Sequence, residues 1–136
     1  MRYMLDTNIP IYLIKNRPPG IAERIDALPA EDVLCMSFVT YAELFKGAER
    51  STRKPEVLRR MGSLARQVPV SYPTDRSICH HYAAQCTRLK PAGTPIGGND
   101  LWIACHALAK NATLVTHNTG EFDRVLGRTV VSWVAS

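Results

Sequence analysis

The stretch Tyr3-Met4-Leu5-Asp6-Thr7-Asn8 decides how the rest of the chain is interpreted. A short apolar run with strand character ends at once in an acid, and a helical pattern over residues 7–15 follows it. Thr7 or Asn8 suits a helix N-cap and Pro10 suits a first helical turn, but neither role explains Asp6. An acid at the end of a core element is costly to bury unless a partner offsets its charge.

Short strands and helices alternate along the whole chain. We expect strands at 2–6, 33–37, 68–71, 113–116 and 129–134, and helices at 7–15, 20–28, 38–49, 55–66, 75–89 and 99–110. This order predicts an α/β fold with a mostly parallel central sheet, and 136 residues without a repeat or linker are most simply one domain, 1–136. In such sheets, ligands bind beyond the carboxyl ends of the strands.

Three further acids stand at the ends or edges of expected core elements. Glu43 lies in the helix at 38–49, Asp100 opens the apolar helix at 99, and Glu121 follows the strand at 113–116 within a polar loop expected at 116–123. Each has an ordinary alternative role, in a capping box with Thr40, at a helix dipole, or as a surface acid. Together with Asp6 they indicate one shared all-oxygen site, which favours Mg²⁺ or Mn²⁺ over zinc. Such a metal activates water and stabilises charge on a phosphoryl oxygen.

The net charge of +5 comes from one segment, residues 46–66, which holds seven basic and two acidic residues. The remainder of the chain carries ten basic and ten acidic groups and is neutral. A clustered basic surface is typical of proteins that bind a phosphate-rich partner, although a solvated helix face gives the same pattern.

The cysteines and the remaining histidines could in principle bind metal or take part in catalysis, but their positions favour structural roles. Cys35 and Cys105 fit small core positions, and the spacing of the four cysteines fits neither a disulfide framework nor zinc. His106 is expected to be a helix histidine without chemistry. His117 could ligate a metal, but a lone loop histidine is more often exposed or hydrogen-bonded, and we expect that of His117. Asn99 suits the N-cap of the helix that follows it. No membrane span or signal peptide is evident, so we expect a cytoplasmic protein.

These elements resemble the PIN-domain ribonucleases, and among them the VapC toxins of bacterial toxin–antitoxin pairs. The resemblance rests on MLDTNIPIYLIKN at 4–16, SFVTYAELFKGAERS at 37–51, GTPIGGNDLWIACHALAKNATLVTHNTGEF at 93–122 and the final Val131-Ser132-Trp133. It covers almost the whole chain in order. It implies an α/β/α sandwich around a parallel sheet and a Mg²⁺-dependent endoribonuclease. It also implies a homodimer and a VapB-type antitoxin partner that blocks the site, often with a basic side chain.

The resemblance also assigns roles to residues. The acidic centre corresponds to Asp6, Glu43 and Asp100, with Asp6, Asp100 and Glu121 as metal ligands and Glu43 as a ligand or as a group that positions water. Many members have an acid at the position of Asn118, so Glu121 is the less certain fourth acid. Supporting polar groups would be Asn8, Asn99, Thr116 and Asn118, and RNA phosphates would be bound by Arg50, Arg53, Arg59 and Arg60. By analogy the substrate is tRNA, the initiator tRNA anticodon loop in particular.

Three alternatives fit the sequence less well. A receiver domain needs paired acids near the first strand and an acceptor Asp after the middle strand, and this chain has neither. A haloacid-dehalogenase-type phosphatase needs a second Asp where this chain has Asn8. A non-catalytic RNA-binding PIN-like domain remains the stronger alternative, and the retained acids argue against it.

Overall fold

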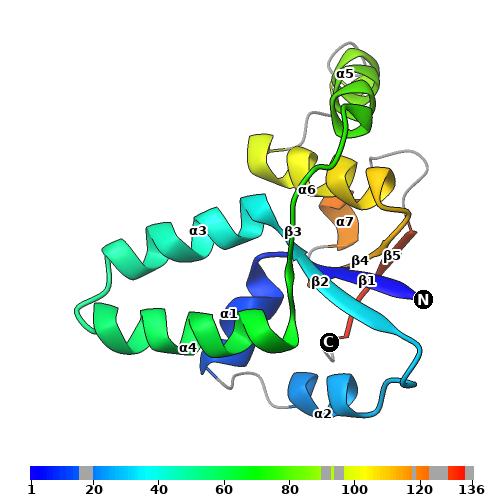
Figure 1. The fold of residues 1–136 in the computed structure, drawn as a ribbon. Helices are drawn as coiled ribbons and strands as arrows, with labels where there is room; N and C mark the ends of the chain where they lie inside the picture. The colour runs from blue at the N-terminus through cyan, green and yellow to red at the C-terminus, as the bar shows by residue number, and fades with distance from the viewer. Residues whose placement is uncertain (16–19, 90–92, 94–96, 118, 123–128, 134–136) are drawn as a thin grey trace.

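The computed structural model has a five-stranded sheet with helices on both faces (Figure 1). It describes residues 1–15, 20–89, 93, 97–117, 119–122 and 129–133. The elements in chain order are β1 (Arg2–Leu5), α1 (Asn8–Lys15), α2 (Ile21–Asp26), β2 (Val33–Ser37), α3 (Phe38–Glu49), α4 (Lys54–Gln67), β3 (Val70–Ser71), α5 (Ser77–Leu89), α6 (Gly98–Ala109), β4 (Thr113–Val115), α7 (Thr119–Phe122) and β5 (Thr129–Val131).

The strands lie in the order β3-β2-β1-β4-β5 and every pairing is parallel. The chain therefore winds from β1 toward one edge of the sheet and returns to the other side of β1 as β4. This change of direction makes the carboxyl ends of β1 and β4 a topological switch point. The connections that follow the two strands run in opposite directions there and leave a crevice for a ligand. The predicted fold class is confirmed.

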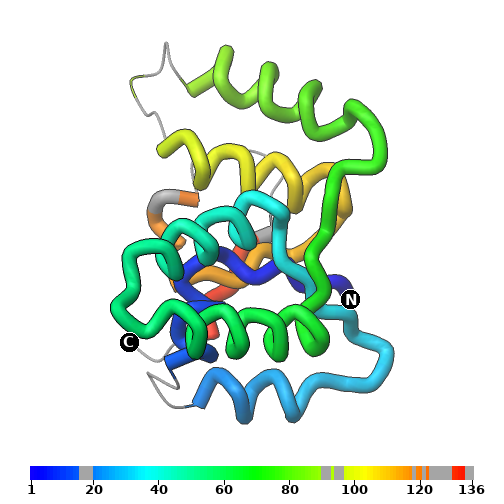
Figure 2. The backbone as a smooth tube through the Cα atoms, turned by 60° about the vertical axis from the view of Figure 1, so that its left-hand side comes forward, coloured from blue at the N-terminus to red at the C-terminus, as the bar shows by residue number. Residues whose placement is uncertain are grey.

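Successive side chains along each strand point to opposite faces of the sheet, and this divides the core into two layers. Met4, Cys35 and Leu114 point to the face covered by α5, α6 and α7, while the next residues, Leu5, Met36 and Val115, point to the face covered by α1 to α4. Because both faces are buried, each central strand is apolar on both sides, as parallel sheets require. Figure 2 shows α3 and α4 side by side as a helical hairpin, and the two helices pack against each other.

Two expectations about local structure were wrong, and one alternative interpretation of Glu43 is excluded. Residues 119–122 form the short helix α7 rather than a loop. The helix α6 begins at Gly98 with Gly97 as its N-cap, so Asn99 lies inside the first turn. The N-cap of α3 is Ser37, whose Oγ accepts from the backbone N–H of Val39 at 3.1 Å, so Thr40 is not the cap of a capping box with Glu43.

Among the described residues, no helix has the length and the apolar character needed to cross a bilayer.

Candidate active site at the carboxyl ends of the central strands

Asp6 follows β1 directly and is only 5% exposed. Its backbone N–H donates to the carbonyl of Val115 at 2.8 Å, which extends the pairing of β1 with β4 by one residue. Its Oδ2 accepts from the hydroxyl of Thr116 at 2.8 Å, and Thr116 is itself fully buried. The strand pairing therefore places a buried carboxylate at the switch point of the sheet, and a neutral hydroxyl orients it.

Glu43 lies on α3, and its position is set by the residue next to Asp6. Oγ1 of Thr7 donates to Oε1 of Glu43 at 2.6 Å and lies 3.2 Å from Oγ1 of Thr40. The length of the first bond is typical of a hydroxyl donating to a charged oxygen. The sequence indicates only a helix cap for Thr7, because the two partners of this contact are 36 residues apart along the chain.

Asp100 is half-buried in the first turn of α6. The helix packs against α3, α7 and β4, and its N-terminal end lies on the same side of the sheet as the carboxyl ends of the strands (Figure 1). An acid in the first turn of a helix is stabilised by the helix dipole. Asn99, beside it, is exposed.

The fourth acid is placed only by its backbone. Glu121 belongs to α7, which follows β4 and packs against α6. The position of the Glu121 side chain and the whole of Asn118 lie outside the described part of the structure. His117 is exposed, with its ring edge-on to Tyr12 at 6.2 Å, as expected for a loop histidine.

The donor chemistry of this region fits a hard cation such as Mg²⁺ or Mn²⁺. Every candidate ligand is an oxygen, and Oδ1 of Asn8 is buried without a hydrogen-bond partner among the described residues. The described residues nevertheless contain no group of three or more His, Cys, Asp or Glu side chains close enough to hold a metal. The described acids alone therefore do not complete a site.

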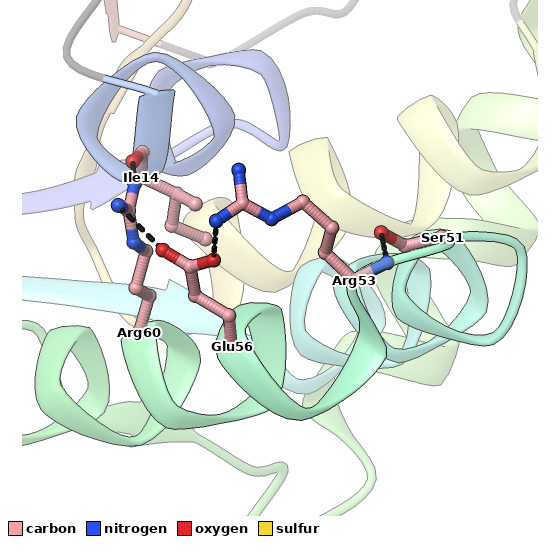
Figure 3. Close-up of polar contacts among 5 residues, drawn as sticks. All are labelled: Ile14, Ser51, Arg53, Glu56 and Arg60. Carbon is pink, nitrogen blue, oxygen red and sulfur yellow. Dashed lines mark hydrogen bonds and ion pairs between the residues drawn. The ribbon is translucent and has the colours of Figure 1, made fainter.

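The basic segment is partly neutralised. Glu56 pairs with Arg53 through Oε2 and with Nη2 of Arg60 through Oε1 at 2.9 Å, and Arg60 also donates to the carbonyl of Ile14 at 2.8 Å (Figure 3). These contacts tie α4 to the end of α1. By contrast, the side chains of Arg50 and Arg59 are exposed and make no hydrogen bond or ion pair within the described residues.

A cavity of about 490 Å³ lies between α1, α3 and α4. Its wall is largely apolar and includes Ile11, Leu44 and Met61, while Glu43 and Arg60 add charge. Glu43 belongs both to the wall of this cavity and to the contact with Thr7, so the cavity borders the candidate active site at Glu43.

The cysteines remain outside this chemistry. Cys35 and Cys105 are buried in the core, as predicted. Burial raises the pKa of the Cys105 thiol to about 12 and also raises that of Cys35, so both stay protonated and unreactive.

The fold and the residues at its switch point match a known class of protein. The PIN domain family model matches residues 3–127, so the chain belongs to the PIN domain family. Within that family its relatives are VapC proteins. The chain is 55% identical to "Ribonuclease VapC1" of Haemophilus influenzae strain R2866 over 125 residues, which is 92% of each chain.

Two other comparisons agree. The chain is 35% identical to "tRNA(fMet)-specific endonuclease VapC" of Shigella flexneri over 133 residues, 98% of each protein. Its fold superimposes on VapBC-1 from nontypeable Haemophilus influenzae with a TM-score of 0.90, 53% identity and 98% coverage of both chains.

Proposed function

We propose that this chain is a Mg²⁺-dependent endoribonuclease of the cytoplasm, the toxin of a VapBC-type pair, which hydrolyses phosphodiester bonds in RNA. The observation that carries the proposal is the contact from Thr7 to Glu43 beside the buried Asp6, at the switch point of the sheet. The similarity to VapC ribonucleases supports the reaction class. The similarity to the Shigella flexneri endonuclease supports tRNA as substrate, and the initiator tRNA in particular.

In this proposal Asp6, Asp100 and Glu121 hold the cation, while Asn8, Asn99, Thr116 and Asn118 support them. When bound, Mg²⁺ lowers the pKa of a coordinated water and stabilises charge on the phosphoryl oxygens. Thr7 occupies Oε1 of Glu43, so we assign Oε2 to orienting the attacking water. Thr116 keeps Asp6 in one orientation without cancelling its charge.

RNA phosphates would be bound by the basic segment. Arg50 and Arg59 are exposed and carry their charge to solvent, so they are the stronger candidates. Arg53 and Arg60 share Glu56, and each would bring less net charge to a phosphate unless RNA displaces that carboxylate.

A VapB-type antitoxin would bind at the cavity between α1, α3 and α4. The structural neighbour from Haemophilus influenzae is a VapBC complex, which supports an antitoxin partner. The apolar wall suits apolar side chains of an inserted segment, and Glu43 suits a basic side chain at its end. Binding there would block the water site.

A second copy of the chain would cover a different face. Phe45 and Tyr72 are 43% and 58% exposed. Phe45 meets the half-buried Tyr41 edge to face, and Tyr72 stacks on the half-buried Phe38. Exposed aromatic side chains of this kind, on α3 and directly after β3, are typical of an interaction surface. We assign it to the homodimer.

The test uses purified, antitoxin-free protein and total bacterial RNA, with Mg²⁺ or with EDTA. We expect discrete fragments that require Mg²⁺ and disappear in Asp100→Asn. The matched control, Asp26→Asn, removes an exposed acid on α2 and should cleave like the wild type. Binding without cleavage, equal in all three proteins, would instead establish a non-catalytic RNA-binding PIN-like domain.

A further inference from the structure

His106 is a polar side chain in the middle of the apolar helix α6, and it is completely buried. Both of its ring nitrogens have a partner. Nδ1 lies 2.8 Å from Oγ of Ser37, and Nε2 lies 3.4 Å from Oγ of Ser71. The ring is also held edge-on by Phe38, at 5.7 Å between centroids. A histidine that only filled space would not need hydroxyl partners at both nitrogens.

The two serines are the last residues of neighbouring strands. Ser37 ends β2 and Ser71 ends β3, and they face each other in the parallel register. The imidazole therefore bridges this pair of serines at the carboxyl edge of the sheet. This bridge links α6 to the ends of both strands, and β3 is only two residues long.

The same contacts connect the helices that carry two of the candidate acids. Ser37 is the N-cap of α3, whose later turn carries Glu43. His106 lies six residues after Asp100 on α6, about 9 Å along the helix axis at ~1.5 Å per residue. A helix moves as a rigid unit, so a shift of α6 at His106 is passed on to Asp100. The contact of His106 with Ser37 therefore sets the position of Asp100 relative to Glu43.

We infer that His106 is a positioning residue for the active site: its hydrogen bond to Ser37 fixes α6 against the start of α3, and so fixes Asp100 relative to Glu43. The inference rests on the proposed ribonuclease function for its consequence in catalysis. A positioning role would explain why His106 is polar and hydrogen-bonded, although the sequence alone indicated no chemical role for it. Displacements of about 1 Å at a reacting centre can cost on the order of 100-fold in rate.

Two conservative variants separate the two hydrogen bonds. In His106→Asn the amide stands near the place of Nδ1 and can keep the bond to Ser37, whereas in His106→Gln it stands near Nε2 and can reach only Ser71. His106→Leu keeps neither. The control Ile21→Ala removes a buried side chain from α2, on the opposite face of the sheet, and lowers stability without touching α6.

The experiment measures kcat and the half-saturating Mn²⁺ concentration for RNA cleavage, together with the ¹³Cγ NMR shift of Asp100 in metal-free protein. We expect His106→Leu and His106→Gln to lose about 10-fold to 100-fold in kcat, to need more Mn²⁺ and to move the Asp100 signal. His106→Asn should recover most of the activity, and Ile21→Ala should leave all three readouts near wild type.

The inference is overturned if folded His106→Leu matches Ile21→Ala in all readouts, or if Gln rescues as well as Asn does. The NMR readout does not depend on cleavage. If wild-type protein cleaves no RNA, the proposed function fails, and the Asp100 signal alone still decides whether His106 positions that residue.

Discussion

Acid should destabilise this protein through His106 in particular. Burial lowers the pKa of the imidazole from 6.5 to about 4, and the positive charge of Lys110 lowers it further in the same direction. Protonation would give the ring two N–H donors between two serines, and Ser37 Oγ already accepts from the N–H of Val39. The folded state therefore resists a proton that the unfolded chain accepts readily.

The size of the effect follows from linkage. Between pH 6.5 and about 4 the unfolded state binds one more proton than the folded state, so stability falls as pH falls through this window. The full effect of the shift is about 3 kcal/mol at 1.36 kcal/mol per pKa unit. At pH 5 about 2 kcal/mol of it is already lost, and above pH 7 almost none is.

Urea unfolding at pH 7.5, 6 and 5, followed by circular dichroism, measures this loss. The reference is His106→Asn, which lacks the titrating group and can keep the contact to Ser37. Wild type should lose about 2 kcal/mol more than the variant between pH 7.5 and 5, a shift of roughly 1 M in the urea midpoint. Parallel losses in the two proteins, or an imidazole NMR signal of the folded state that titrates near 6.5, would refute the reasoning.

Three further perturbations test other contacts. Thr7→Val leaves Glu43 without its donor, and we expect kcat for RNA cleavage to fall about 10-fold to 100-fold with an unchanged thermal midpoint; unchanged kcat would exclude an orienting role. Thr116→Val removes one hydrogen-bond donor to a buried carboxylate and should cost about 1–3 kcal/mol in urea unfolding, against a loss near zero if the bond is dispensable. Glu56→Gln should change stability by less than about 1 kcal/mol, because its ion pairs are partly exposed. In an Asp100→Asn background it should also steepen the salt dependence of RNA binding, and an unchanged slope would mean that Arg53 and Arg60 do not contact phosphates.

The elements with strong local signals were predictable from the sequence. The strand β2 and the helix α3 have the expected bounds, 33–37 and 38–49, because an apolar run passes through a serine cap into a helical pattern. The helix α7 was missed because four residues are too few for a helical period to appear. The strand expected from 68 begins at Val70, because Val68 is buried in the core without pairing in the sheet, and the strand end expected at 134 lies outside the described residues.

The residue types of the candidate site could be chosen from the sequence, but their contacts could not. Asp6 could be identified because the local sequence pattern shows an acid directly after an apolar strand. The partnership of Thr7 with Glu43, and that of His106 with Ser37, join residues 36 and 69 positions apart, so only the folded topology brings them together. Similarly, the composition of the basic segment counts Arg53 and Arg60 as free charge, and the structure pairs both with Glu56.

The carboxylates of the basic segment and those of the candidate active site have different kinds of hydrogen-bond partner. Where a carboxylate only ties helices together, as Glu56 does, its partners are arginines and the charges cancel. At the carboxyl edge of the sheet, Asp6 and Glu43 accept from the neutral hydroxyls of Thr116 and Thr7. A hydroxyl fixes the direction of a carboxylate and leaves its negative charge in place, which is the condition for attracting a divalent cation. Replacing either threonine with lysine would keep a donor yet cancel that charge, so orientation and charge are separable properties of this site.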